Sequence, residues 1–112
     1  MGNYKDLIAY KKAYELAMQI FQLTKGFPPE EKYSLTDQIR RSSRSVCTNL
    51  AEAYKRRRYK DYFISKLNDS ETENTETEVW LNFSSDCHYL KEEDYLTLIQ
   101  LNNEVSKLLY GI

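Results

Sequence analysis

The side chains that could carry out chemistry are few in this chain and lie far apart. Its one histidine, His88, has no second histidine with which to share a metal ion, and Cys47 and Cys87 do not form a CxxC pair. Di-metal sites in helical bundles use a Glu-x-x-His motif on two helices, and nucleophilic triads also need a histidine beside the nucleophile. We therefore predict a protein that is not an enzyme, with no metal site and no cofactor. Both cysteines are expected to be small buried thiols.

Two carboxylates, Glu73 and Glu76, are three residues apart and would share one face of a helix. They could contribute metal ligands, but they have no histidine partner. We interpret the pair as part of a solvated acidic surface.

The segment with the clearest functional character is basic. Most of the positive charge lies in the middle third of the chain, on Arg40, Arg41, Arg44, Lys55, Arg56, Arg57, Arg58, Lys60 and Lys66, interleaved with Tyr54, Tyr59 and Tyr62. Basic side chains hold a phosphate backbone without reading its sequence, and aromatic rings stack on unpaired bases. The pattern predicts non-specific binding of RNA or DNA. The alternative is that Arg56 pairs with Glu52 one turn earlier, while the other charges are solvated or contact the acidic stretch of a neighbouring subunit.

The charge balance reverses in the following segment, from Asp69 to Asp94, where nine carboxylates stand against Lys91. The formal net charge of -1 therefore conceals a strong asymmetry, which would steer an anionic partner to one surface. An alternative function is a protein–protein interaction scaffold in which this asymmetry orders subunits head to tail. The ten tyrosines suit interfaces and favour a homo-oligomer, although they could equally line the rim of a monomer's core.

The apolar periodicity predicts one all-α domain over residues 1–112, with helices over approximately 4–25, 31–54, 60–90 and 92–110. Gly26 is expected to end the first helix in a left-handed conformation, with Pro28 and Pro29 following it. A strong apolar stripe is expected to restore the core face of the third helix after residue 78, on Val79, Trp80, Phe83, Cys87 and Leu90. Short connections between the four helices indicate an antiparallel bundle.

The stretch from Asn68 to Glu78 contains no large apolar residue, so an acidic linker is one interpretation. We favour a helix, because the stretch lacks Gly and Pro and the helical spacing of Phe63 and Leu67 continues through Ser70, Asn74, Thr77, Leu81 and Ser84. Those residues would form a polar seam inside the bundle, which fixes register if its hydrogen bonds are satisfied.

No run of about 20 apolar residues occurs, and no basic region followed by an apolar stretch opens the chain. We expect a cytoplasmic protein without a membrane partner.

Several short motifs, taken together, resemble a known family. They are Asp6-Leu7, Phe27-Pro28, the run from Tyr33 to Ser43 (YSLTDQIRRSS), Ser45-Val46, Asn49-Leu50-Ala51-Glu52, and Glu76-Thr77 followed by Trp80-Leu81. The set is similar to the short four-helix bundle proteins encoded inside intervening sequences of bacterial 23S ribosomal RNA genes, and it covers nearly the whole chain. Two features depart from that family: Ala53 replaces its usual Gly, and residues 68–73 are more polar than its Ala- and Leu-rich stretch.

The resemblance implies a left-handed up-down-up-down bundle that assembles into homopentamers. It also implies a nucleic-acid connection, since a related branch serves as the accessory subunit of diversity-generating retroelements, binding a reverse transcriptase and RNA through a basic surface. No catalytic residue is established in the family. Asn49 and Glu52 are expected to be structural, with Glu52 answering an arginine across a subunit boundary, and a binding role is the second possibility. With Tyr54, Tyr59, Tyr62 and Trp80 they form the predicted structural and interface set.

Overall fold

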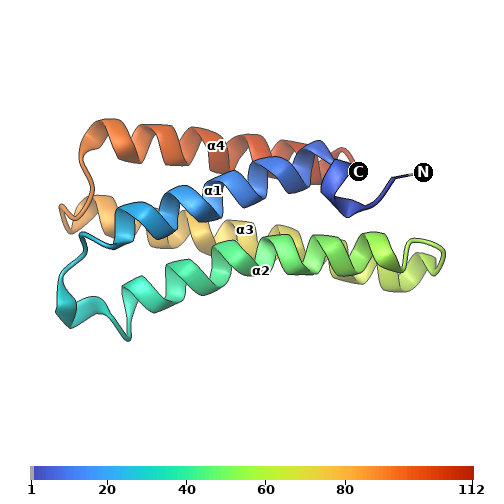
Figure 1. Ribbon diagram of the computed structural model, residues 1–112, viewed down its shortest axis with the longest axis horizontal. Coiled ribbons are helices and arrows are strands. Elements are labelled where there is room, and N and C mark those ends of the chain that lie inside the picture. Colours follow the sequence, from blue (N-terminus) through green and yellow to red (C-terminus); the bar gives the residue numbers. More distant parts are fainter. Residues whose placement is uncertain (1) are drawn as a thin grey trace.

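The computed structural model describes residues 2–112, which form four α-helices and two short 3-10 helices and contain no strand. The elements in chain order are η1 (Tyr4–Asp6), α1 (Ile8–Thr24), η2 (Pro29–Glu31), α2 (Leu35–Lys55), α3 (Lys60–Asp86) and α4 (Glu92–Tyr110). Successive helices run in opposite directions, and α4 returns beside α1 (Figure 1). The predicted all-α four-helix bundle is confirmed, and its left-handed sense stays a prediction. No helix in residues 2–112 combines the length and the apolar character needed to cross a bilayer.

The first two helices begin later than predicted, because polar side chains build separate turns before them. Asn3 caps η1 by accepting a hydrogen bond from the Lys5 amide at 2.8 Å, and the chain is extended at Leu7 before α1 begins. Before α2, the Glu31 carboxylate accepts hydrogen bonds from the Ser34 hydroxyl at 2.6 Å and from the Leu35 amide at 3.3 Å. These local bonds satisfy donors that a continuous helix would use differently.

The residue that adopts a left-handed conformation at a helix end is not the one predicted. Gly26 is not left-handed, since His88 (φ 62°) is the position with positive φ among the described residues. At the end of α3 the His88 amide donates to the Ser85 carbonyl and the Tyr89 amide to the Ser84 carbonyl, both at 2.9 Å. This is a Schellman motif with histidine in the place usually taken by glycine. The predicted third helix, 60–90, therefore ends at Asp86.

The core consists of two apolar clusters that lie on either side of a polar seam. One cluster contains Ala9, Ala13, Val46, Cys47, Leu50, Val105 and Leu109, and the other contains Leu16, Ile20, Ile39, Leu81, Leu98 and Leu101. The seam of α3 is helical and buried as predicted, including Asn74 and Thr77. Asn74 and Asn102 exchange side-chain-to-carbonyl hydrogen bonds of 3.0 Å, and the Ser42 and Thr77 hydroxyls lie 2.8 Å apart. Every fully buried side-chain nitrogen and oxygen in residues 2–112 has a partner.

Candidate nucleic-acid interface

The turn between α2 and α3 forms one end of the molecule, the same end at which both chain termini lie (Figure 1). We call this region the basic tip; it consists of Lys55, Arg56, Arg57, Arg58 and Lys60 with Tyr54, Tyr59 and Tyr62. All five basic residues are exposed. Because α2 remains helical through the buried Ala53 to Lys55, the basic residues that follow Ala53 lie beyond the core, at the end of the bundle.

The tip holds two of its arginines on tyrosine rings. The Arg57 guanidinium lies 4.3 Å from the centroid of the Tyr54 ring and donates a hydrogen bond of 2.8 Å to the Tyr54 carbonyl, which helps cap α2. Arg56 lies 5.3 Å from the Tyr62 ring centroid. Among the described residues, no carboxylate comes within ion-pair distance of a basic residue of the tip. Tyr59 is 64% exposed and extends the surface with an uncovered ring.

Lys66, one turn further along α3, is neutralised within the chain. Its ammonium lies 3.0 Å from a Glu52 carboxylate oxygen and 3.5 Å from Asn49 Oδ1. The hydrogen bond that this ammonium donates to Glu52 is the main cause that raises the pKa of Lys66. The predicted pairing of Glu52 with Arg56 is therefore wrong within this chain. Asn49 also donates to the carbonyl and the hydroxyl of Ser45, both at 2.9 Å, so both residues have structural contacts here.

Arg40 and Arg44 belong to the other end of the molecule. Arg40 donates to Thr24 Oγ1 at 2.8 Å and to the Phe21 carbonyl at 3.3 Å, so it caps the last turn of α1. Its guanidinium lies 4.8 Å from the Phe21 ring centroid, and that of Arg44 lies 5.7 Å from it. Arg56 follows the end of α2, sixteen positions after Arg40, which places it about 24 Å further along the helix axis. The single basic surface predicted from the sequence is divided by the fold.

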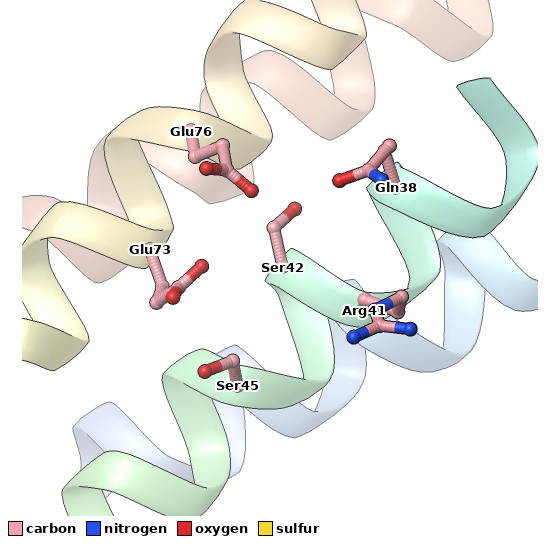
Figure 2. A pocket seen from close by; sticks show the side chains of 6 residues that line it. All are labelled: Gln38, Arg41, Ser42, Ser45, Glu73 and Glu76. Carbon is pink, nitrogen blue, oxygen red and sulfur yellow. The ribbon is translucent and has the colours of Figure 1, made fainter. Parts of the chain in front are cut away.

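Arg41 borders an acidic pocket between α2 and α3 (Figure 2). The pocket has a volume of ≈ 290 Å³, and Glu73 and Glu76 point into it from α3 toward Ser42 and Ser45 on α2. Partial burial, followed by the charge of Glu76, raises the pKa of Glu73. Glu76 is exposed but Glu73 is half-buried, so the prediction of a solvated acidic face is correct for only one of the two. Arg41 itself is exposed and lies 3.9 Å from Asp37.

The stripe expected to restore the core face of α3 does not form that face, although Trp80 and Leu90 are partly buried against the second apolar cluster. Leu81 and Ser84 are the buried residues there, whereas Phe83 is 53% exposed and Cys87 is also exposed. Trp80 is half-buried and lines a groove with Phe83 and the exposed Tyr33. The prediction of two buried thiols holds for Cys47, whose pKa burial raises to about 11, and is wrong for Cys87. Leu81 and Ser84 instead occupy the core positions, as the spacing of the polar seam predicts, and the Ser84 hydroxyl donates a 2.8 Å hydrogen bond to the Trp80 carbonyl.

The geometry has close parallels among known proteins. Residues 5–111 match the family described as 23S rRNA-intervening sequence protein. A solved structure from Bacteroides thetaiotaomicron VPI-5482, described as a protein with unknown function from the S23 ribosomal protein family, is 33% identical, with 96% of each chain covered and a TM-score of 0.84. A search of curated proteins gives no match. The extent of the first match and the agreement in fold together establish that this chain belongs to the family of 23S rRNA-intervening sequence proteins.

Proposed function

We propose that this protein is a non-enzymatic, oligomeric subunit that binds RNA or DNA without sequence preference through the basic tip. The observation that carries the proposal is the group of five exposed cations without ion-pair partners among the described residues, beside an exposed tyrosine. Such a surface neutralises phosphates and offers a ring for stacking, but it has no rigid pair of donors for a base edge. The compartment that we propose is the cytoplasm.

The test is RNA binding measured by fluorescence anisotropy as a function of salt, using a mixed-sequence 20-mer with a 5′-hydroxyl end. With three to five phosphates neutralised, the affinity should fall by about tenfold or more between 50 and 200 mM salt. Charge reversal at Arg56, Arg57 and Arg58 should weaken binding by at least about 100-fold. Reversal of Lys25, Lys32 and Lys91, which changes the net charge equally at the other end, should weaken it less than about fivefold. Equal losses in the two triple variants would contradict the proposal.

We further propose that the subunits assemble into a homopentamer, as the resemblance to the family implies. The exposed rings of Tyr33 and Phe83, together with the asymmetric charge, supply surface suited to an interface. Light scattering coupled to size exclusion, at micromolar concentration, measures the mass directly. A mass near 13.3 kDa, that of one chain, would exclude the pentamer.

A protein-interaction scaffold without nucleic acid is the second candidate function. It is favoured by the groove of ≈ 660 Å³ between α2 and α3 that Tyr33, Trp80 and Phe83 line. In this case the unaltered protein would show no salt-dependent RNA binding, and the triple reversal at the tip would disturb the head-to-tail assembly that light scattering measures.

A further inference from the structure

A pocket at the corner between α1 and α2 has the composition of an oxyanion-binding site. Its volume is ≈ 290 Å³. The connection between α1 and α2, which carries most of the lining residues, lies at the end of the bundle opposite the α2–α3 turn (Figure 1). Lys25, Lys32 and Arg40 line the pocket, together with the hydroxyl residues Thr24 and Thr36. No carboxylate lines the pocket, so the three cations face it without a compensating charge.

The pocket adjoins the amino-terminal end of α2. Thr36 is the second residue of this 21-residue helix, where the macrodipole is positive and the backbone amides have no carbonyl one turn earlier. The Leu35 amide is bonded to Glu31, and the Gln38 amide to the Ser34 carbonyl at 2.9 Å. The Thr36 amide has no such partner within residues 2–112.

The Thr36 side chain provides independent evidence for a missing ligand. The residue is only 7% exposed, yet its hydroxyl makes no hydrogen bond to any other part of the described chain. Because every fully enclosed side-chain oxygen in residues 2–112 has a partner, the Thr36 hydroxyl must open into the pocket that it lines. The hydroxyl is thus held in place and free to bond a ligand, and an acceptor in the pocket would complete its hydrogen bonding.

Arg40 is fixed in position before any ligand arrives. Its bonds to Thr24 Oγ1 and to the Phe21 carbonyl use Nε and Nη2, and the remaining N–H groups of its guanidinium have no partner in the described chain. The Lys25 and Lys32 ammonium groups lie 4.8 Å and 5.3 Å from the ring centroids of Phe21 and Tyr33, and neither is in an ion pair with a described residue. Both lysines are exposed and can move to meet an anion.

We propose that this pocket binds a phosphate group. The Thr36 hydroxyl and amide and the Arg40 guanidinium donate to its oxygens, and Lys25 and Lys32 neutralise its charge. The volume suits a phosphate with a small substituent, such as a phosphorylated metabolite or the 5′-terminal phosphate of a nucleic acid. This site goes beyond the function proposed for the basic tip and does not depend on it.

The test uses ¹⁵N-labelled full-length protein and follows the amide resonance of residue 36 while inorganic phosphate is added at constant ionic strength. The unaltered protein should show a saturable shift with a Kd of about 1–10 mM, typical of so small a ligand. The Lys25→Ala/Lys32→Ala variant should bind at least about fivefold more weakly. Thr36→Val, which keeps the shape and removes the hydroxyl, should bind about threefold more weakly or worse.

The matched control is Lys55→Ala/Lys60→Ala, which removes the same charge from the basic tip and should leave the phosphate affinity unchanged. Dispersed spectra of all variants establish that they are folded. A residue-36 resonance that does not shift saturably, or that shifts equally in Lys25→Ala/Lys32→Ala, overturns the proposal. Failure of RNA binding at the tip would leave this result unaffected.

Two further ligands identify the source of the phosphate group once it binds. A 5′-phosphorylated oligonucleotide that binds more tightly than both its 5′-hydroxyl counterpart and inorganic phosphate assigns the pocket to a nucleic-acid end. A nucleoside 5′-monophosphate that binds as tightly as the phosphorylated oligonucleotide assigns it to a small phosphorylated molecule. Either result supports the site.

Discussion

The two ends of the bundle use arginine in opposite ways. At the basic tip, the guanidinium groups of Arg56 and Arg57 rest on tyrosine rings and are exposed. At the other end, Arg40 is half-buried and bonds to the last turn of α1. The difference is that α1 ends beside α2, so its carbonyls need a donor from a neighbour, whereas the α2–α3 turn needs little from outside itself. An arginine is therefore held by the fold or left exposed according to which helix end lies beside it.

Among the substitutions that test this comparison, replacing Arg40 is expected to change the free energy of unfolding most. Arg40→Ala removes two hydrogen bonds from a charged donor and should lower the free energy of unfolding by about 2 kcal/mol, without changing RNA affinity by more than about twofold. Urea unfolding and anisotropy measure the two quantities. Arg44→Ala is the matched control, since Arg44 contacts the same ring without a bond, and it should cost less than about 1 kcal/mol. A loss of RNA binding in Arg40→Ala alone would show that this end also serves the partner.

Replacing the left-handed residue at the end of α3 by glycine should stabilise the protein. His88→Gly relieves the steric cost of a positive φ in a Schellman motif and should raise the free energy of unfolding by about 0.5–1 kcal/mol. Gly26→Ala is the contrasting change, because Gly26 has an ordinary φ, and an added Cβ would come no closer than 3.6 Å to the Leu23 carbonyl oxygen. Thermal unfolding of both variants gives the comparison. If His88→Gly destabilised the protein, the contacts of the imidazole would have to contribute more free energy than the positive φ costs.

A pH-sensitive hydrogen bond joins the α1–α2 connection to the α3–α4 connection, at the end of the bundle opposite the basic tip. The Tyr89 hydroxyl donates to Glu31 at 2.9 Å. The bond from Ser34, followed by that from Tyr89, lowers the pKa of Glu31 below 4.5, and Glu31 raises the pKa of Tyr89 from 10.0 to about 12. The stabilisation is therefore lost as the pH falls through the lowered pKa of Glu31, and again as it rises toward 12.

Tyr89→Phe tests this assignment. The variant should be less stable than the unaltered protein at neutral pH, by less than Arg40→Ala, and the gap should narrow below about pH 4 and above about pH 11. Melting temperatures across the pH range measure the gap. A gap that is constant with pH would contradict the assignment, because it would mean that the hydroxyl acts only through packing.

The smallest effect is expected at Lys66, beside the tip. Its ammonium is already neutralised by Glu52, so Lys66→Ala should change RNA affinity by less than about twofold. Arg58→Ala, which removes a charge without an ion-pair partner, should weaken RNA binding about threefold. Comparable losses in the two variants would mean that Lys66 leaves Glu52 to contact a phosphate.

Periodicity was enough to predict the four helices and even the polar seam, because helical spacing continues through Ser70, Asn74 and Thr77 regardless of polarity. It could not predict the ends, which depend on contacts between segments distant in the sequence, such as Arg40 with Phe21 and Tyr89 with Glu31. The same holds for the candidate sites. The tip is local in sequence and was predictable, whereas the pocket at Thr36 requires the corner of α1 to be placed against the start of α2.

The reciprocal amides of Asn74 and Asn102 have a consequence for how this sequence can change. Each satisfies the other through bonds of 3.0 Å, at a level of the bundle where neither has access to water. Replacing Asn102 by leucine would take the donor from the buried Asn74 side-chain oxygen, 3.2 Å away, whereas replacing both asparagines would remove all of these side-chain polar groups together. The hydrogen bonds between the two residues tie α3 to α4 at one level, so they penalise any sliding of α4 along α3 that a purely aliphatic layer would permit.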